Sequence, residues 1–295
     1  MKKCIACIAT LSMILAMAGC NSKKETEKKW TPPSGTATEE APSETTTEET
    51  TAEETTTAAE SSEETTTAAE TSADASETSA SEGKVLTYEE YKNAALDSEV
   101  IIEAYVQAKQ SWWDNKATVY LQAEDGAYFA YNMACTEEDY AKLTDGQKIR
   151  VKGFKSEWSG EVEIVDGTFE VIDGTWTATP VDVTADLGTD ALIDKQNQLV
   201  SFAGMKVEAS KDAEGKEVAF LYKWDGSGAE GDDLYFNVSV NDKTYTFTVE
   251  SYLCGQDTEV YKAVKALKVG DTVDMEGFLY WYEGANPHIT KVTVK

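Results

Sequence analysis

The chain has 295 residues, 41% of them hydrophobic, and a formal net charge of −28 at pH 7. Residues 84–295 alone hold 20 basic and 38 acidic residues, enough chain for one large or two small domains, and Arg150 is the only arginine. Nucleic-acid-binding proteins normally carry a basic footprint, so this charge disfavours nucleic acid as a partner and is compatible with cationic ligands or divalent metals.

The first residues have the pattern of a secretory signal. Residues 1–3 are basic, residues 4–18 form an apolar run, and residues 16–20 read Ala-Met-Ala-Gly-Cys. The run is shorter than the roughly 20 residues of a membrane-spanning helix. The ending resembles the bacterial lipobox, with methionine where leucine is commonest. This resemblance implies a lipoprotein: residues 1–19 are removed as signal peptide, and Cys20 carries diacylglycerol and further acyl chains such as palmitate.

The lipid would hold the protein to the outer face of the bacterial cell membrane. The alternative is an ordinary signal peptide with an incidental cysteine. Residues 20–83 follow as a linker rich in Thr, Glu, Ala and Ser, with an imperfect ten-residue repeat in which residues 53–60 recur as residues 63–70. Such a segment buries too little apolar area to offset its chain entropy. We therefore predict a disordered stalk that projects the rest into or beyond the cell wall, with glycosylation of its threonines left open.

The remaining chain contains two similar halves. Each half shows a cysteine (Cys135 or Cys254), a short helical stretch ending in leucine, a glycine turn, an alternating strand and Gly-Phe. Alternating apolar residues predict five strands in each half. In the first half these strands lie near 99–110, 116–124, 127–134, 147–157 and 160–172, with helices at 87–96 and 136–143. In the second half they lie near 198–211, 232–240, 243–252, 270–282 and 287–294, with helices at 189–196 and 256–267.

Five strands with a helix between the third and the fourth resemble the OB-fold, a small Greek-key barrel. The predicted fold is thus mostly β, with one OB-like barrel over residues 84–175 and a second over residues 176–295. The whole resembles tandem OB-like lipoproteins of Gram-positive gut bacteria over about residues 85–295, a resemblance that implies no particular reaction. The two cysteines fall at the same point of separate barrels, which favours two buried thiols over a disulfide.

Residues suited to catalysis are sparse. His288, the only histidine, is expected on the surface before the last strand, and Glu161 and Glu163 are interpreted as a solvated strand face. The sequence lacks a His/Cys cluster of metal-site spacing, a phosphate-binding glycine loop and a Gly-x-Ser-x-Gly motif. We therefore predict no enzyme, no cofactor and no metal. The acidic loop at residues 225–233 lacks the EF-hand spacing, so a mobile loop is favoured over a calcium site.

Aromatic residues gather where OB barrels bind ligands, on the face of strands 2 and 3 and in the loops joining strands 1–2 and 4–5. The candidates are Trp112, Trp113, Tyr128, Tyr131, Trp158, Trp224, Tyr280, Trp281 and Tyr282. Flat aromatic faces stack on sugar rings, so we predict a cell-surface binding module for a glycan or a cell-wall polymer. The alternative is a structural or protein-interaction scaffold with buried aromatics, and an exported hydrolase or nuclease is the weakest hypothesis. Burial of Trp112, Trp113, Trp158 and Trp281 together would exclude the glycan.

Overall fold

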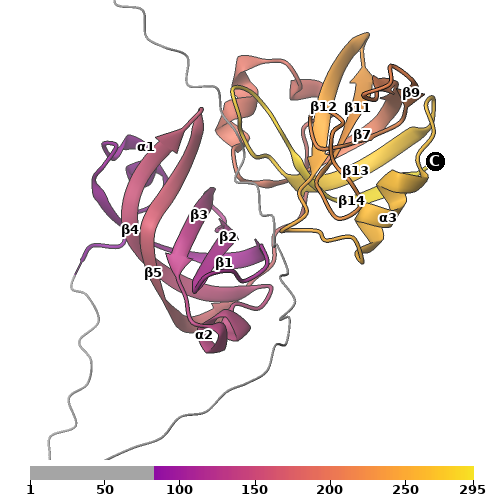
Figure 1. The fold of residues 1–295 in the computed structure, drawn as a ribbon. Helices are drawn as coiled ribbons and strands as arrows, with labels where there is room; N and C mark the ends of the chain where they lie inside the picture. The colour runs from indigo at the N-terminus through magenta and orange to yellow at the C-terminus, as the bar shows by residue number, and fades with distance from the viewer. Residues whose placement is uncertain (1–82) are drawn as a thin grey trace, which may run out of the picture. The chain divides into compact units, whose positions relative to one another are not determined.

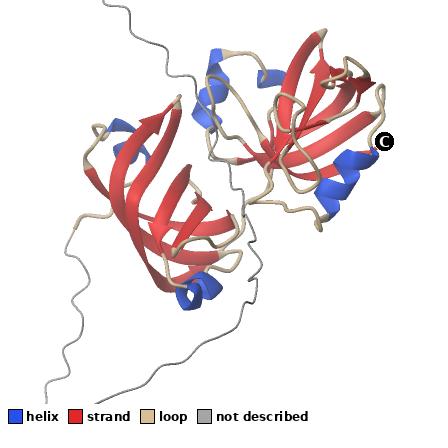
Figure 2. Cartoon of the chain, viewed as in Figure 1, coloured by secondary structure: helices blue, strands red, loops and turns tan. Residues whose placement is uncertain are grey.

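The computed structural model describes residues 83–295, in which strands predominate over helices (Figure 2). The predicted signal peptide, the lipidation of Cys20 and residues 20–82 of the linker lie outside the described residues. Among residues 83–295, no helix has both the length and the apolar character needed to cross a membrane.

Barrel 1 is built from five strands and two short helices (Figure 1). Its elements are α1 (Tyr88–Asn93), β1 (Glu99–Lys109), β2 (Lys116–Gln122), β3 (Ala127–Ala134), α2 (Glu137–Lys142), β4 (Gln147–Trp158) and β5 (Glu161–Thr175). The strands close in the order β1-β2-β3-β5-β4, because β1 also pairs with β4. β3 and β5 pair in parallel and all other neighbours are antiparallel, as in an OB-fold.

Barrel 2 repeats this topology. Its main elements are β7 (Leu199–Glu208), β11 (Leu234–Val240), β12 (Lys243–Val249), α3 (Glu259–Ala266), β13 (Thr272–Phe278) and β14 (His288–Val294). Shorter elements are β6 (Val181–Asp182), η1 (Thr184–Asp186), η2 (Asp190–Lys195), β8 (Ser210–Lys211), β9 (Glu217–Val218) and β10 (Leu221–Tyr222). A pairing of β11 with β7 closes the five main strands into a ring. The prediction of two tandem OB-like barrels is confirmed.

The principal local difference from the prediction is the first strand of barrel 2. β7 ends at Glu208, and residues 210–211 pair with β9 as a separate small hairpin. The connection from β7 to β11 therefore folds back on itself before the second main strand begins. This elaborated connection has no counterpart between β1 and β2, which are separated by only a few residues.

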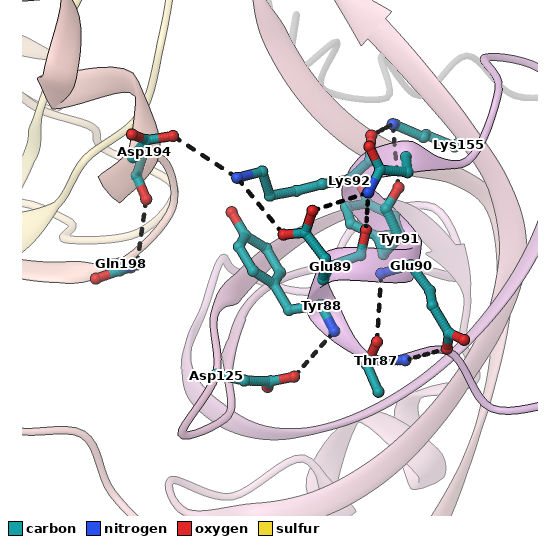
Figure 3. Close-up of polar contacts among 11 residues, drawn as sticks. Thr87, Tyr88, Glu89, Glu90, Tyr91, Lys92, Asp125, Lys155, Asp194 and Gln198 are labelled. Atoms are coloured by element: carbon teal, nitrogen blue, oxygen red, sulfur yellow. Dashed lines mark hydrogen bonds and ion pairs between the residues drawn. The ribbon is translucent and has the colours of Figure 1, made fainter.

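Helix α1 closes one end of barrel 1. Thr87 caps it in both directions: its hydroxyl accepts a hydrogen bond from the Glu90 backbone (3.3 Å), and its own backbone donates to the Glu90 carboxylate (3.0 Å) (Figure 3). The cap directs Tyr91 into the core, where its ring meets Tyr128 edge-on at 4.9 Å. Tyr128 is only 2% exposed, so its prediction as a ligand-binding residue is wrong: it points into the barrel.

The glycines of the two Gly-Phe pairs have the same structural cause. A Cβ atom on Gly153 would lie 2.8 Å from the Val165 carbonyl oxygen, and one on Gly277 would lie 2.3 Å from the His288 carbonyl oxygen. Both glycines adjoin an irregularity in the pairing of their strand with the next one. The repeated motif thus marks the point in each barrel where two backbones approach too closely for a side chain.

The two cysteines are buried thiols, as predicted, and form no disulfide with each other. Cys135 and Cys254 are both free and buried. Burial raises the pKa of the Cys254 thiol to about 12, so that it stays protonated at neutral pH. Both residues belong to the apolar cores of their barrels.

Candidate ligand groove on barrel 2

The β2–β3 face of barrel 1, where an OB-fold usually binds its ligand, is covered by barrel 2. Tyr120 and Phe129 face each other across β2 and β3, and each is at most 2% exposed. The Tyr120 ring stacks on Phe278 of barrel 2 at 4.3 Å, and the Phe129 ring meets Tyr280 at 5.4 Å. This face therefore serves as a contact between the barrels.

The same contact buries His288, which corrects its prediction as a surface histidine. His288 is 6% exposed, and its Nδ1 atom lies 2.9 Å from the Tyr120 hydroxyl in a hydrogen bond. The ring also stacks on Tyr280 at 4.4 Å. Burial lowers the pKa of His288 to about 3, so the imidazole is neutral over the physiological range.

Glu161 and Glu163 are buried as well, so the interpretation of a solvated strand face is wrong. Glu161 is wholly buried, and its carboxyl accepts hydrogen bonds from the Trp281 backbone (2.9 Å) and from the Asn197 amide (2.6 Å) of barrel 2. Burial raises the pKa of Glu161 well above its ordinary value and that of Glu163 to about 7. Strand alternation alone failed here because the outer face of β5 is covered by the other barrel.

Barrel 2, in contrast, has an open groove over the equivalent strands. A cavity of about 560 Å³ lies over the outward face of β11 and β12. It is lined by Ala209, Ser210, Lys211, Leu221, Trp224, Tyr235, Asn237, Thr246, Tyr282, Ala285 and Asn286. One wall comes from the connection between β7 and β11, and the other from the connection between β13 and β14. These are the strand face and the two loops that frame ligand sites in OB-folds.

The floor of the groove is polar and already ordered. The Asn237 amide donates to the Ser210 hydroxyl (3.1 Å) and accepts from the Thr246 hydroxyl (2.8 Å). At the rim, the Asn286 amide oxygen accepts from the Thr248 hydroxyl (2.9 Å). Amides both donate and accept hydrogen bonds, and these contacts fix their orientation. Lys211 is the only charged residue in the lining, which suits an uncharged polar ligand.

Two of the predicted aromatic residues line this groove. Trp224 is 55% exposed, and Tyr282 stands on the opposite wall. Trp158, from the turn between β4 and β5 of barrel 1, lies with its ring 5.2 Å from that of Tyr282. The structure thus brings Trp158 to the edge of a groove on the other barrel, which no sequence pattern indicated.

The other candidates lie elsewhere. Trp281 and Tyr280 contact barrel 1, and the Trp112 indole donates to the Cys135 carbonyl oxygen (2.9 Å). Tyr131 is 40% exposed beside Phe129, and Trp113 is 71% exposed at the β1–β2 hairpin. Because Trp113 and Trp158 are exposed, the four tryptophans chosen to exclude a glycan are not all buried.

The sequence analysis missed Tyr235, Asn237, Thr246 and Asn286. In β11 and β12 the inward positions are apolar and the outward ones largely polar, with Asn237 paired to Thr246. This alternation was the available signal. The predicted site, which was built from aromatic residues, therefore lacked these amides and hydroxyls, and it also lacked Tyr235 on β11.

Two carboxylates of the acidic loop at residues 225–233 bond within the loop, whereas Glu230 and Asp233 accept hydrogen bonds from residues outside it. Asp225 accepts hydrogen bonds from the Ser227 backbone (3.0 Å) and hydroxyl (2.7 Å), and Asp232 accepts from the Ala229 backbone (2.9 Å). Over residues 83–295, no three His, Cys, Asp or Glu side chains are grouped as ligands for a metal ion.

No family model and no curated protein matches the chain. Solved structures similar to it include a HINa domain in complex with double-stranded DNA, at 10% identity and a TM-score of 0.31, over 67% of this chain and 98% of that one. A murine DNA-binding protein bound to double-stranded DNA has 10% identity and a TM-score of 0.33, over 66% and 96%. A replication protein A heterotrimer bound to single-stranded DNA has 11% identity and a TM-score of 0.29, over 67% and 49%.

This likeness concerns the fold alone. It corrects one expectation: disfavouring nucleic acid on the basis of charge was wrong, because the similar structures include complexes with DNA of both kinds. The chain has the architecture of two tandem OB-like barrels.

Proposed function

We propose that the protein is a binding module whose ligand lies in the groove of barrel 2, and that this ligand is a glycan or cell-wall polymer. The observation that carries the proposal is the pairing of Trp224 and Tyr282 on opposite walls with fixed amides between them. Binding sites typically combine apolar and aromatic walls with a few oriented polar groups. A sugar ring matches that combination, because it has apolar faces and hydroxyls at its edge.

The contrast between the barrels supports a single site. Barrel 1 uses Tyr120 and Phe129 to contact barrel 2, and both side chains are buried. That arrangement is also what favours the second candidate, a structural or protein-interaction scaffold. The groove distinguishes them, since a scaffold alone has no need of an ordered polar floor beside exposed aromatic rings.

The site of display is a separate proposal that rests on the sequence of residues 16–20. We propose that Cys20 is lipidated and that the barrels are exposed outside the bacterial cell membrane. Replacing Cys20 with serine should abolish labelling by a fatty-acid analogue, because the thiol is the attachment point. Labelling that survives in Cys20→Ser would contradict the anchor without affecting the groove.

The groove is tested by binding of the full chain to purified cell walls and to an array of soluble glycans. Trp224→Ala should weaken binding about tenfold, equivalent to about 1.4 kcal/mol. Its effect on the free energy of unfolding should be small, because Trp224 is 55% exposed. The matched control is Trp113→Ala, which removes an exposed tryptophan outside the groove.

Equal binding by the Trp224→Ala variant and the wild type would contradict the groove, as would an equal loss in Trp113→Ala. Single- and double-stranded DNA are assayed in parallel. Binding to DNA that depends on Trp224, with none to glycans, would retain the groove and overturn the glycan as its ligand.

A further inference from the structure

The turn between β4 and β5 of barrel 1 is seated against the connection between β13 and β14 of barrel 2. The Glu283 backbone donates a hydrogen bond to the Ser159 carbonyl oxygen (2.8 Å). Gly160 has a φ of +90°, and a Cβ atom placed on it would lie 2.7 Å from Cδ1 of Trp281. The turn and the connection are therefore in close contact through both backbone and side chain.

The same connection forms one wall of the groove. Tyr282, Ala285 and Asn286 line the cavity, while Trp281 lies between Gly160 of barrel 1 and the core of barrel 2. The connection is held internally by a hydrogen bond from the Asn286 backbone to the Tyr280 carbonyl oxygen (2.9 Å). A displacement of Trp281 would therefore be transmitted to the residues that line the groove.

The Glu161 side chain of barrel 1 is hydrogen-bonded to this connection. It follows the turn directly and is wholly buried. One carboxyl oxygen accepts from the Trp281 backbone (2.9 Å) and from the Gln196 amide (3.3 Å), and the other accepts from the Asn197 amide (2.6 Å). All three donors belong to barrel 2, so Glu161 joins the wall of the groove to η2 and the start of β7.

We propose that Glu161 is a positioning residue for the groove: with the β4–β5 turn, it holds residues 280–286 in the shape that binds ligand. Barrel 1 would then act as the support of the site on barrel 2. This inference rests on the proposed function of the groove, and it assigns to the covered barrel a part in binding.

The surroundings of Glu161 favour its neutral form. The titratable groups that interact with it electrostatically are Glu163 on the same strand, Tyr88 and Tyr91 of α1, Tyr120 of β2, and Tyr280 of barrel 2. No member of this set carries a positive charge. Burial raises the pKa of Glu161 and outweighs the hydrogen bonds from Asn197 and Trp281, which lower it, so the carboxyl is protonated at higher pH than an ordinary glutamate.

Hydrogen-bond geometry is consistent with a proton on Glu161. The 2.6 Å separation from the Asn197 amide is short for an N–H donor and ordinary for an O–H donor. The Asn197 Oδ1 atom is buried without a hydrogen-bond partner among the described residues. The Asn197 amide nitrogen also donates to the Val162 carbonyl oxygen (3.3 Å), so turning the amide over would exchange that hydrogen bond for one from a protonated Glu161 to Asn197 Oδ1. A glutamine at position 161 could make the same contact, whereas an alanine could not.

The test measures hydrogen exchange of residues 280–286 in the ligand-free full chain at pH 6 and pH 9, corrected for the pH dependence of unhindered exchange. Protection in the wild type should fall at the higher pH, because an ionised Glu161 would be buried without a cation. Glu161→Gln should stay protected at both values. Glu161→Ala should exchange about tenfold faster at both, with β11 and β12 as internal references. Glu157→Gln, which removes an exposed carboxylate from the same hairpin, should match the wild type.

Wild-type protection of residues 280–286 in Glu161→Ala would overturn the proposal. The proposal would also be overturned if protection of residues 280–286 depended on pH in Glu161→Gln as strongly as in the wild type. If Glu161→Ala exchanges faster throughout the chain, the comparison with Glu161→Gln is the deciding result. Because exchange is measured without ligand, this result is independent of the glycan-binding assay. A groove that binds no glycan but loosens in Glu161→Ala would refute the proposed function and leave Glu161 as the support of the loop.

Discussion

The two barrels use the same strand face in opposite ways. In barrel 1, Tyr120 and Phe129 form a cross-strand pair on the outward face, and barrel 2 covers both. In barrel 2, the outward cross-strand pair is Asn237 with Thr246, and a groove lies above it. The topology is the same in both barrels, so it does not determine whether this face is buried or open. The side chains at the outward positions of the two strands determine that.

The difference follows from solvation. Burial of an aromatic side chain contributes about 1.5–3 kcal/mol, so a pair such as Tyr120 and Phe129 stabilises a contact with another barrel. Burial of an amide or hydroxyl costs free energy unless each polar atom finds a partner. Asn237 bonds to Thr246 and to Ser210. Both side chains can contact a ligand only while the groove above them stays accessible.

The two Gly-Phe pairs also differ in the exposure of equivalent residues. Gly153 and Gly277 play the same part in their barrels, but Phe154 is 41% exposed and Phe278 is 2% exposed. Phe278 is buried because the Tyr120 ring stacks on it. The close approach of two strands within the barrel requires the glycine. The exposure of the phenylalanine depends on whether another barrel packs against it.

The largest effect is expected from removing the aromatic contact between the barrels. Tyr120→Ala should lower the free energy of unfolding by about 3–5 kcal/mol, as is typical when a buried aromatic side chain is truncated. The loss also leaves His288 without its hydroxyl partner. Urea denaturation measures the change, with Asn237→Ala in the groove as the matched variant of the open face.

Asn237→Ala should cost about 1 kcal/mol, the value of an ordinary side-chain hydrogen bond. If the two variants were equally stable, the covered and open faces would not differ energetically as the structure implies. Tyr120→Phe isolates the hydroxyl, and its cost should fall between the other two.

An intermediate effect is expected from the paired glycines. Gly153→Ala and Gly277→Ala should each destabilise the protein by about 1–3 kcal/mol, because an added methyl group meets closely packed atoms. Gly277→Ala should cost more, since its nearest contacts are all backbone atoms of β14 that cannot rotate away. Thermal unfolding measures both.

Gly255→Ala is the control for these variants. A Cβ atom on Gly255 would meet only the Ser251 carbonyl oxygen, at an ordinary 3.6 Å. Tolerance of alanine at Gly153 or Gly277 to the same degree would show that the repeated glycine is not required by the barrel.

The last effect is the pH dependence of stability. Burial raises the pKa of Glu163 from 4.5 to about 7, so the native protein binds this proton more tightly than the unfolded chain does. The resulting stability is fully present below pH 4.5 and is lost as the pH rises to about 7. Glu163→Gln should reduce this decline by about 1.4 kcal/mol per pH unit, as measured by urea denaturation at several pH values.

Glu157→Gln on β4 should leave the pH dependence unchanged, because that carboxylate is exposed. A wild-type slope in Glu163→Gln would mean that Glu163 is not held in its neutral form by the contact between the barrels. Burial of a carboxyl group would then not be one of the differences between the covered face of barrel 1 and the open face of barrel 2.

Local patterns were sufficient to predict the five main strands of each barrel, but not the small hairpin of β8 and β9. The alternation in residues 127–134, for example, predicts β3 with the bounds that the structure has. Tyr128 was nevertheless assigned to the ligand face, because alternation defines two faces and does not identify which one is the core. Trp224 and Tyr282 were predicted from their place in the loops. Asn237 was missed because alternation marks its position as outward without showing that a ligand binds there, and Asn286 lies in a loop, where no such alternation exists.

The two barrels follow from the amino-acid sequence, since strand periodicity, helix caps and the Gly-Phe glycines are local requirements of the backbone. The packing of one barrel on the other determines that the strand 2–3 face is buried in barrel 1 and open in barrel 2. It also decided the burial of His288 and Glu161, which lie on outward positions of their own barrels. Solvation of an outward side chain depends on what packs against it from elsewhere in the chain, and no local pattern records that partner.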